Sequence, residues 1–294
     1  MLNNLINISN LEIEDISTIM NKARKFQLSK TESSSKGKNV VLLFNENSTR
    51  TRFSFEMACH NLGLRIFHFD IENTSLSKDE SIYDTVSNLY AIGIDCIIVR
   101  HSEENFFNKI LLASDQRISV INAGVGCIAH PTQALLDYYT LKRHFGSING
   151  KKIVIVGDIL HSRVAHSNIE LLKKFDVNIC LCAPEYFYDQ QLSEMEWESN
   201  LNKALENADV VMALRVQKER LENEFPILDY MKKYRLDVNN FPQNAILLHP
   251  GPVNRDIEVS SKLLSTEKGR TILEQAKNGV YVRMAILDLI LGTR

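Results

Sequence analysis

A run of hydroxyl and guanidinium side chains, Ser48 to Arg52, stands between an apolar stretch and a helix-like segment in "FNENSTRTRFSFE". A polar loop that enters a helix exposes unpaired backbone N–H groups and the positive end of the helix dipole, and both attract anions. Ser48, Thr49 and Thr51 add hydroxyl donors, and Arg50 adds a planar fork suited to phosphate or carboxylate oxygens. Taken alone, the run is equally well explained by a helix cap beside solvated arginines.

Arg100, His130 and Gln133 form a second group of candidate residues. Arg100 ends an apolar run, and "HPTQ" places His130 and Gln133 around an expected helix start at Pro131. Residues three apart share a helix face, so the imidazole and the amide are expected on the same side. Alone, "HPTQ" is also explained by a helix cap with a hydrogen-bonded histidine.

Arg163, Arg215 and Gln217 occupy comparable places later in the chain. Arg163 follows "GDILHS", and Arg215 directly follows the apolar run "VVMAL", with Gln217 two residues further on. A charged side chain at the end of a buried strand is unusual enough to indicate a binding role. The structural alternatives are a surface helix residue for Arg163 and an ion pair with Glu219 or Glu222 for Arg215.

Other polar residues have a structural interpretation when they are taken singly. Lys78 lies in a polar loop and is expected to be solvated, and "HPGP" at 249–252 is expected to make a turn. Asp158 is expected to cap a helix rather than to bind a metal. His161 and His166 are expected at the surface.

Short β-branched runs alternate with helix-like segments in two successive series. Buried strands are predicted at 39–44, 65–70, 95–100 and 118–124, and then at 151–158, 177–184, 208–214 and 244–252. Helices are predicted around 55–62 and 82–89, and near 163–175, 201–207 and 218–234. The last segment, 278–292, is an unusually apolar helix that must be buried.

Two series of βα units predict an α/β protein with two doubly wound parallel-sheet domains, joined within 130–151. Ligands of such sheets bind beyond the carboxyl ends of the strands. Each cationic candidate, Arg50, Arg100, Arg163 or Arg215, follows such an end. We therefore expect the active site in the cleft between the two domains.

Composition narrows the class of protein. The chain has 294 residues, of which 44% are hydrophobic and 24% are charged, as expected for a globular protein with a large core. Its 34 basic and 36 acidic residues argue against a general nucleic-acid binder, so an anion site must come from local clustering. Five cysteines, mostly within apolar runs, indicate reduced thiols in a cytoplasmic protein. We expect neither a secretory signal nor a membrane span, and 157–163 lacks the G-x-G-x-x-G of a nicotinamide site.

The motifs are more specific in combination than singly. "FNENSTRTRFSFE", "VRH", "HPTQALLD", "GDILHSRVAHSN", "LRVQKERL" and "HPGPVNRDIE" resemble, in this order, those of aspartate carbamoyltransferase catalytic chains. S-T-R-T-R and H-P-x-Q are shared by the wider aspartate/ornithine carbamoyltransferase family. R-V-Q-x-E-R and H-P-G-P are typical of the aspartate branch, where ornithine enzymes have a cysteine-containing H-C-L-P. The similarity spans nearly the whole chain.

The resemblance implies transfer of a carbamoyl group from carbamoyl phosphate to the amine of L-aspartate, an early step of pyrimidine synthesis. Residues 1–140, completed by a C-terminal helix at 279–294, would bind carbamoyl phosphate, and residues 141–278 would bind aspartate. The carbamoyl phosphate ligands would be Ser48, Thr49, Arg50, Thr51, Arg100, His130, Gln133, Gly251 and Pro252. The aspartate ligands would be Lys78, Arg163, Arg215 and Gln217. Catalysis would rest on Arg50, Thr51, Arg100 and His130.

The resemblance also implies a homotrimer with shared active sites, in which a loop carrying Ser75 and Lys78 enters the neighbouring subunit's site. It implies no cofactor, metal, nucleic acid or membrane, and it leaves regulatory chains undetermined. Two residues depart from the family's pattern: Asn47 replaces a frequent proline, and Asp79 replaces a glycine after the loop lysine. Asp79 adds negative charge beside Lys78 and removes a permissive backbone position, so that loop is expected to differ in pose from the family's.

Three alternatives remain open from the sequence. The chain could be a carbamoyltransferase for another amino acid, a non-catalytic anion-binding homologue, or a dinucleotide-binding oxidoreductase. The chemistry favours aspartate carbamoyl transfer because both substrates are polyanions and no redox step or metal is required. Many arginines, few carboxylates and no cysteine nucleophile among the candidates fit that reaction.

Overall fold

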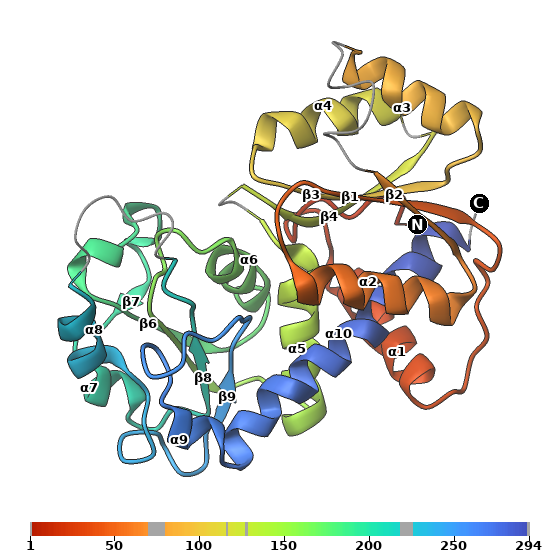
Figure 1. Ribbon diagram of the computed structural model, residues 1–294. Coiled ribbons are helices and arrows are strands. Elements are labelled where there is room, and N and C mark those ends of the chain that lie inside the picture. Colours follow the sequence, from red (N-terminus) through yellow and green to blue (C-terminus); the bar gives the residue numbers. More distant parts are fainter. Residues whose placement is uncertain (1, 70–79, 116, 127–128, 218–225, 293–294) are drawn as a thin grey trace. The chain divides into compact units, whose positions relative to one another are not determined.

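Two parallel sheets with interspersed helices make up the chain, which confirms the predicted α/β fold class (Figure 1). The computed structural model describes residues 2–69, 80–115, 117–126, 129–217 and 226–292. The chain divides into two compact units: residues 1–139 with 276–294, and residues 140–275. Each unit is described by itself.

The first unit contains a four-stranded parallel sheet in the order β2-β1-β3-β4. Its strands are β1 (Asn39–Phe44), β2 (Arg65–Phe69), β3 (Cys96–His101) and β4 (Ser119–Val125). All four lie within a residue or so of their predicted positions, and β1, β3 and β4 are buried along nearly their whole length. The register pairs Phe44 with Arg100, so β1 and β3 end at the same edge of the sheet.

Helices cover both faces of this sheet (Figure 1). They are α1 (Ile13–Gln27), α2 (Thr49–Leu62), α3 (Ile82–Ala91), α4 (Glu104–Ser114) and the first part of α5 (Pro131–Phe145). α3 and α4 lie on one face, where Val86, Phe107 and Ile110 pack into a core with strand residues such as Val41 and Ile97. α1 and α2 lie on the opposite face.

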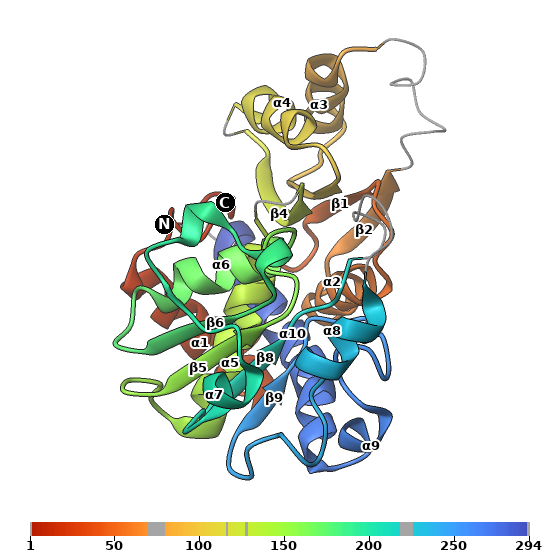
Figure 2. The ribbon, with the colours of Figure 1, turned by 90° about the vertical axis from the view of Figure 1, so that its left-hand side faces the viewer.

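The second unit contains a five-stranded sheet in the order β7-β6-β5-β8-β9, and all its pairs are parallel. Figure 2 labels four of these strands, β5, β6, β8 and β9. Its strands are β5 (Lys152–Val156), β6 (Asn178–Cys182), β7 (Glu196–Trp197), β8 (Val210–Ala213) and β9 (Ile246–Leu248). β7 was not predicted, because two residues at a sheet edge leave no periodic pattern. β5, β6 and β8 end in register, with Val156 beside Cys182 and Ala213.

The helices of the second unit are α6 (Arg163–Leu172), α7 (Leu201–Leu205), α8 (Ile227–Tyr234) and α9 (Ser261–Leu264). Two short 3₁₀ turns, η3 (Glu185–Phe187) and η4 (Gln190–Leu192), follow β6. The predicted helix at 218–234 is described only from residue 226 onward. Within the described residues, no helix is long and apolar enough to cross a bilayer.

The C-terminal helix α10 (Glu267–Leu291) begins in the second unit and ends in the first. It starts well before residue 278, the predicted beginning of its apolar part, because its first turns are amphipathic rather than apolar. Val282, Ala285 and Ile286 are buried completely, so the expectation of a buried apolar helix is confirmed.

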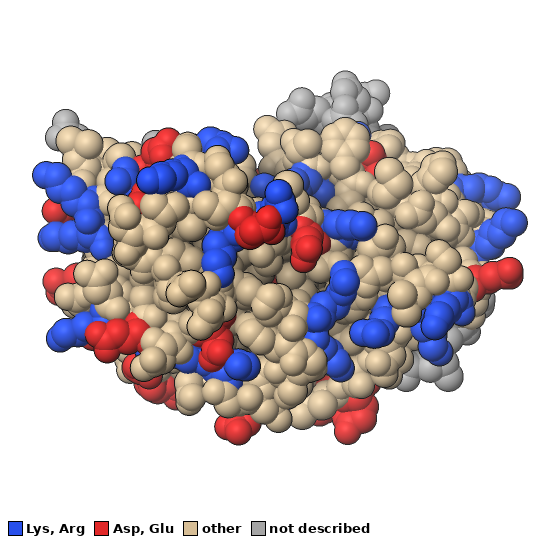
Figure 3. Space-filling model, turned by 90° about the horizontal axis from the view of Figure 1, so that it is seen from below, with Lys and Arg blue, Asp and Glu red and all other residues tan. Residues whose placement is uncertain are grey.

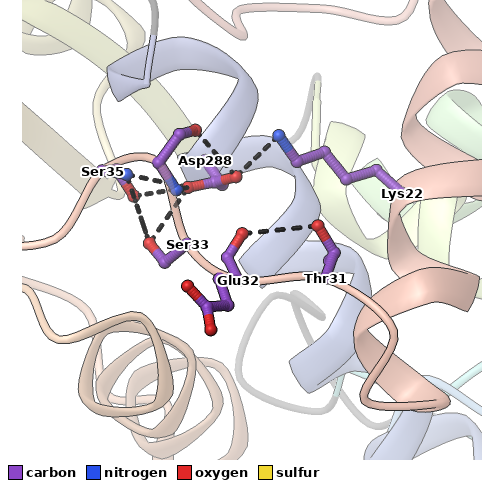
Figure 4. Close-up of polar contacts among 7 residues, drawn as sticks. Lys22, Thr31, Glu32, Ser33, Ser35 and Asp288 are labelled. Atoms are coloured by element: carbon purple, nitrogen blue, oxygen red, sulfur yellow. Dashed lines mark hydrogen bonds and ion pairs between the residues drawn. The ribbon is translucent and has the colours of Figure 1, made fainter.

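Asp288 anchors the end of α10 to the loop before β1 (Figure 4). Its carboxylate accepts hydrogen bonds from the backbone N–H groups of Ser34 and Ser35 at 2.8 and 3.0 Å, and from the hydroxyls of Ser33, Ser34 and Ser35. Lys22 on α1 places its Nζ 2.6 Å from Oδ2 of the same carboxylate. One buried acid therefore fixes the C-terminal helix, the serine loop and α1 to one another.

Candidate active site

The loop between β1 and α2 carries the first group of candidate residues. Ser48 is the N-cap of α2, and its hydroxyl accepts a hydrogen bond from the backbone N–H of Thr51 at 3.4 Å. Thr49 and Arg50 begin the helix on its exposed side, while the Thr51 side chain is buried. The capping interpretation of Ser48 is therefore right, and the same turn directs N–H groups and an arginine beyond the end of β1.

Arg100 lies at the carboxyl end of β3, next to a shift in the register between β3 and β4. The shift occurs between Val99 and His101, and irregularities of this kind turn side chains away from the regular pleat. The guanidinium Nη1 donates to the Ala123 carbonyl at 3.2 Å, and Nη2 lies 3.2 Å from Oε2 of Glu46. Arg100 is thus a buried cation whose position is set by β4 and by the loop after β1.

His130 and Gln133 are buried at the start of α5, which begins at Pro131 as predicted. The Thr132 hydroxyl lies 3.4 Å from Nδ1 of His130. The Gln133 amide donates through Nε2 to Oδ1 of Asp137 at 2.9 Å. This buried partner of Gln133 was not singled out from the sequence, although "HPTQALLD" contains it.

These residues all follow strands of one parallel sheet. Ser48 follows β1, Arg100 ends β3 and His130 follows β4, and the carboxyl ends of parallel strands lie at one edge. The first unit therefore presents hydroxyl, N–H and guanidinium donors from the same side of its sheet. Such a set can bind and polarise an anionic substrate without a metal ion.

Asp158 is the centre of a hydrogen-bonded group in the second unit. It follows β5 and is fully buried, and its Oδ1 accepts from the backbone N–H of His161 at 3.2 Å and lies 2.8 Å from His161 Nδ1. Its Oδ2 accepts from the backbone N–H of Gln217 at 3.2 Å. Burial raises the pKa of the Asp158 carboxyl, and these contacts oppose the rise. The Gln217 amide in turn donates to the His161 carbonyl at 2.7 Å.

His161 and His166, predicted at the surface, are partly exposed and each is held by a carboxylate. His161 is held by Asp158, and Nε2 of His166 lies 2.7 Å from Oδ2 of Asp189. Both carboxylate partners are buried, and each histidine is only partly exposed. A buried carboxylate can therefore hold a histidine partly away from solvent, and sequence spacing does not predict this contact.

Arg163 and Arg215 also lie beyond strand ends of the second sheet. Arg163 is the first residue of α6, directly after the N-cap Ser162, and it is buried rather than a surface helix residue. Arg215 follows β8 and is half-buried. The second unit thus places two guanidinium groups at the same edge of its sheet as Gln217.

A buried acid, Glu258, links the loop after β8 to the segment after β9. Its Oε1 accepts from the backbone N–H of Val216 at 3.3 Å and from Nδ2 of Asn254 at 3.1 Å. In the "HPGP" segment, Nδ1 of His249 accepts from the backbone N–H of Gly251 at 2.7 Å. Gly251 has a φ of 65°, which glycine adopts without strain, and Pro252 follows it. Glu258 therefore holds the backbone between Arg215 and Gln217.

Thiol chemistry has little support in the described part of the chain. Cys59, Cys96, Cys180 and Cys182 are all buried, and burial raises the pKa of the Cys59 and Cys182 thiols to about 12. Thiols with such pKa values stay protonated at neutral pH and are poor nucleophiles. In the same residues, no group of three His, Cys, Asp or Glu side chains could hold a metal ion. Ser75 and Lys78 lie outside the described residues.

Charged side chains of both signs are interspersed on the face seen in Figure 3. No single-sign patch of the kind that binds nucleic acid dominates it. This agrees with the net charge of -2, so the positive potential at any anion site must come from local groups rather than from the charge of the whole protein.

Comparison with known proteins identifies the family. Residues 3–143 match the family described as "Aspartate/ornithine carbamoyltransferase, carbamoyl-P binding domain", and residues 149–290 match "Aspartate/ornithine carbamoyltransferase, Asp/Orn binding domain". The chain belongs to the aspartate/ornithine carbamoyltransferase family. The sequence-based resemblance is thereby confirmed.

Relatives within this carbamoyltransferase family cover the whole chain. An aspartate carbamoyltransferase catalytic subunit of Ligilactobacillus salivarius is 40% identical, over 100% of this chain and 96% of its own length. The corresponding subunit of Listeria monocytogenes serotype 4b is 38% identical, over 99% and 96% of the two chains. Both relatives belong to the aspartate branch of the carbamoyltransferases.

Solved structures of carbamoyltransferases share the fold. The catalytic subunit of M. jannaschii aspartate transcarbamoylase has a TM-score of 0.88 at 30% identity, covering 100% of this chain and 99% of that chain. Aspartate transcarbamoylase from Trypanosoma cruzi, in complex with carbamoyl aspartate and phosphate, has a TM-score of 0.88 at 26% identity, covering 98% and 96%.

Proposed function

We propose that this chain transfers the carbamoyl group of carbamoyl phosphate to the amine of L-aspartate, giving N-carbamoyl-L-aspartate and phosphate. One observation carries the proposal. A chain 38–40% identical to aspartate carbamoyltransferase catalytic subunits over its whole length has cationic and hydrogen-bonding side chains at the carboxyl ends of both its sheets. Two anionic substrates need such groups in both units.

The first unit binds carbamoyl phosphate in this proposal. The backbone N–H groups at the start of α2, the hydroxyls of Ser48, Thr49 and Thr51, and the Arg50 guanidinium hold the phosphate. Arg100, His130 and Gln133 hold the carbamoyl end. The burial of these last three supports the assignment, because electrostatic interactions are stronger where water is excluded.

The reaction itself is an acyl transfer in which a C–N bond replaces a C–O bond. The aspartate amine attacks the carbamoyl carbon, and negative charge builds on the carbamoyl oxygen. Thr51, Arg100 and His130 stabilise that oxygen, and one preorganised donor of this kind is typically worth about 3 kcal/mol. The bond to the phosphate oxygen then breaks, Arg50 stabilises the departing phosphate, and the amine's proton leaves on that phosphate.

The second unit binds aspartate in this proposal. Arg163 and Arg215 neutralise the two carboxylates, and Gln217 adds an amide donor. The backbone of Gly251 and Pro252 contacts the carbamoyl group. Two arginines suit a dicarboxylate such as aspartate and would repel the second amine of ornithine, so aspartate is the expected amine substrate.

The direct test supplies purified protein with carbamoyl phosphate and either aspartate or ornithine. Colorimetric detection of carbamoyl aspartate is the expected result. Faster product formation with ornithine would indicate the ornithine branch, and no product with either amine would indicate a non-catalytic homologue.

The assembly and setting follow from the same assignment. We propose a cytoplasmic homotrimer in which Ser75 and Lys78 of one subunit complete the site of the next, acting early in pyrimidine synthesis. The names of the relatives, which are catalytic subunits, support a subunit that works within an assembly. Sedimentation analysis of the purified chain tests the trimer directly.

A further inference from the structure

A buried arginine on the C-terminal helix contacts the helix that begins with the phosphate-binding loop. Arg283 on α10 is 3% exposed, and its Nη1 donates to the Ser54 hydroxyl at 2.8 Å. Its guanidinium also lies over the Phe55 ring, 4.9 Å from the centroid. Ser54 lies four residues, or about one turn, after Arg50 on α2. Arg283 therefore fixes the first turns of α2 from behind.

The same arginine faces the helix that carries Gln133. Asp137 on α5 is fully buried, and its negative charge raises the pKa of Arg283, so the two groups attract each other. Gly279, one turn before Arg283 on α10, shows how closely the helices meet. A Cβ on Gly279 would lie 2.6 Å from Nη1 of Arg283 and 3.1 Å from Cδ2 of Leu136, the neighbour of Asp137. Three helices thus converge around one guanidinium.

This arrangement is costly for stability. Burial and, to a smaller extent, the nearby positive charge of Arg100 lower the pKa of Arg283 to about 9, although the charge of Asp137 opposes them. Within the described residues, Nε of Arg283 is buried without a hydrogen-bond partner. Buried ionic groups with incomplete hydrogen bonding add little to the free energy of unfolding compared with apolar residues. A contribution to stability therefore does not explain why Arg283 and Asp137 are charged, and a role in the neighbouring binding site explains it better.

The binding-site group that contacts Asp137 is the amide of Gln133. An ionised carboxylate only accepts hydrogen bonds, so the NH₂ group of Gln133 must be the part that faces Asp137. The amide oxygen of Gln133 is then directed elsewhere and is ready to accept an N–H. The NH₂ group of a carbamoyl substrate offers that donor, whereas the methyl group of an acetyl substrate does not.

We propose that Asp137 and Arg283 are positioning residues that hold the Gln133 amide with its oxygen toward substrate, so that the site selects a carbamoyl over an acetyl group. This inference rests on the proposed function, since it assigns Gln133 to the carbamoyl end. Asp137 acts through Gln133, and Arg283 acts by holding Asp137 and α2 in register.

The test compares carbamoyl phosphate with acetyl phosphate, in which a methyl group replaces NH₂. The KM for carbamoyl phosphate and the Ki of acetyl phosphate are measured for the wild type and for Asp137→Asn, a near-isosteric change. The ratio of this Ki to this KM is the selectivity ratio. An asparagine at position 137 adds an NH₂ donor where the carboxylate could only accept, so it no longer requires the NH₂ group of Gln133 to face it and allows that amide to flip. The KM should rise about 10-fold while the Ki changes less than about twofold, because a polar site discriminates through donors left unpaired.

A structural role predicts a different pattern. If Asp137 were only structural, Asp137→Asn would weaken the binding of both ligands equally, or would lower the melting temperature without changing the selectivity ratio. Either result overturns the proposal. In a Gln133→Ala background, Asp137→Asn should change the ratio no further, because the residue acts through Gln133. If Asp137→Asn lowered the selectivity ratio further in the Gln133→Ala background, the proposal would also be overturned.

Gly279→Ala provides a second variant should Asp137→Asn fold poorly. Alanine favours a helix over glycine, so folding should be retained, while the new methyl displaces the far end of Arg283. The selectivity ratio should fall in assays run well below the variant's melting temperature, and an unchanged ratio counts against the proposal.

Failure of this inference is distinguishable from failure of the proposed function. If wild-type protein makes carbamoyl aspartate and Gln133→Ala lowers the ratio while Asp137→Asn does not, only the positioning role is lost. If wild-type protein makes no carbamoyl aspartate, the proposed function itself is wrong.

Discussion

Arg50 is the residue whose loss is expected to harm catalysis most at little cost in stability. Its side chain is exposed at the start of α2, and the proposed role is to stabilise the departing phosphate. Arg50→Ala should lower kcat at least ~100-fold, on the scale of a lost preorganised donor. Steady-state assays at saturating substrates check this.

Arg52 supplies a matched control two residues further along the same helix. It is an exposed arginine whose Nε lies 2.9 Å from Oε1 of Glu56, an i,i+4 surface pair. Arg52→Ala should leave kcat within about twofold, because exposed pairs of this kind contribute little. Equal losses in Arg50→Ala and Arg52→Ala would mean that the catalytic role is misassigned.

The buried carboxyl of Asp158 should make aspartate binding depend on pH. Burial raises the pKa of its carboxyl, so this group takes up a proton before ordinary aspartates do as the pH falls. Protonation weakens its hold on the Gln217 N–H and on His161. The KM for aspartate should therefore rise as the pH falls, and the rise should begin above the ordinary pKa of free carboxyls near 4.

Asp158→Asn imitates the protonated state and should remove that dependence. Its KM for aspartate should be raised about 10-fold near pH 7 and stay flat toward pH 5, on the scale of one charge-assisted hydrogen bond. Unfolding does not account for the acid limb, because a raised carboxyl pKa makes the Asp158 contribution to stability largest at low pH and smaller as the pH rises. A wild-type KM in the variant would refute the role.

At the residue scale, single motifs were predictable and their partners were not. Ser48 and Arg50 could be selected because residue type and position at a strand end are visible in the sequence. Asp137 and Glu258 were not selected, although both lie within quoted motifs. Their importance depends on burial and on which N–H groups face them, and the tertiary packing decides both.

At the element scale, the end of α10 should depend on one carboxylate. Burial tends to raise the pKa of Asp288, but the hydrogen bonds from Lys22 and the serine loop outweigh it and leave the pKa lowered. Asp288→Asn should reduce the free energy of unfolding by about 3 kcal/mol at pH 7, since it breaks a buried ion pair. Denaturant unfolding measures this.

The pH dependence of that loss has a definite sign. A lowered carboxyl pKa contributes stability that is present above the unfolded value near 4 and is lost as the pH falls through the folded value. The difference between wild type and Asp288→Asn should therefore shrink below about pH 4. Asp229→Asn, which removes an exposed pair with Lys233, should change stability by less than about 0.5 kcal/mol and serves as the control.

Elements with a strong pattern were predictable, and those without one were not. The buried strands β1 and β3 are continuous β-branched runs, and α2 has Gly63 at its left-handed C-cap, with a φ of 70°. β7 is two residues long and forms only because β6 offers it a free edge. Such a strand depends on pairing with a neighbouring strand, so its own sequence does not predict it.

At the scale of the whole molecule, two series of βα units were enough to predict two parallel sheets. The return of the chain was harder to foresee. The apolar character of the segment near Val282 required burial somewhere, and the polar contacts of Arg283 and Asp288 are among those that tie α10 to the first unit. Long-range closure of this kind depends on a few buried polar contacts far apart in the sequence.

The proposed homotrimer with shared sites leads to the last prediction. Lys78→Ala and Arg50→Ala should each be nearly inactive, but after mixed reassembly one subunit can supply an intact Arg50 and its neighbour an intact Lys78. With equal amounts and random assembly, about a quarter of the sites regain both residues, so activity should return to roughly a quarter of the wild-type value. Arg50→Ala mixed with Arg100→Ala should show no recovery, because the first unit of a single chain carries both residues. Recovery in that control, or none with Lys78→Ala, would show that the sites are not composed across subunits in this way.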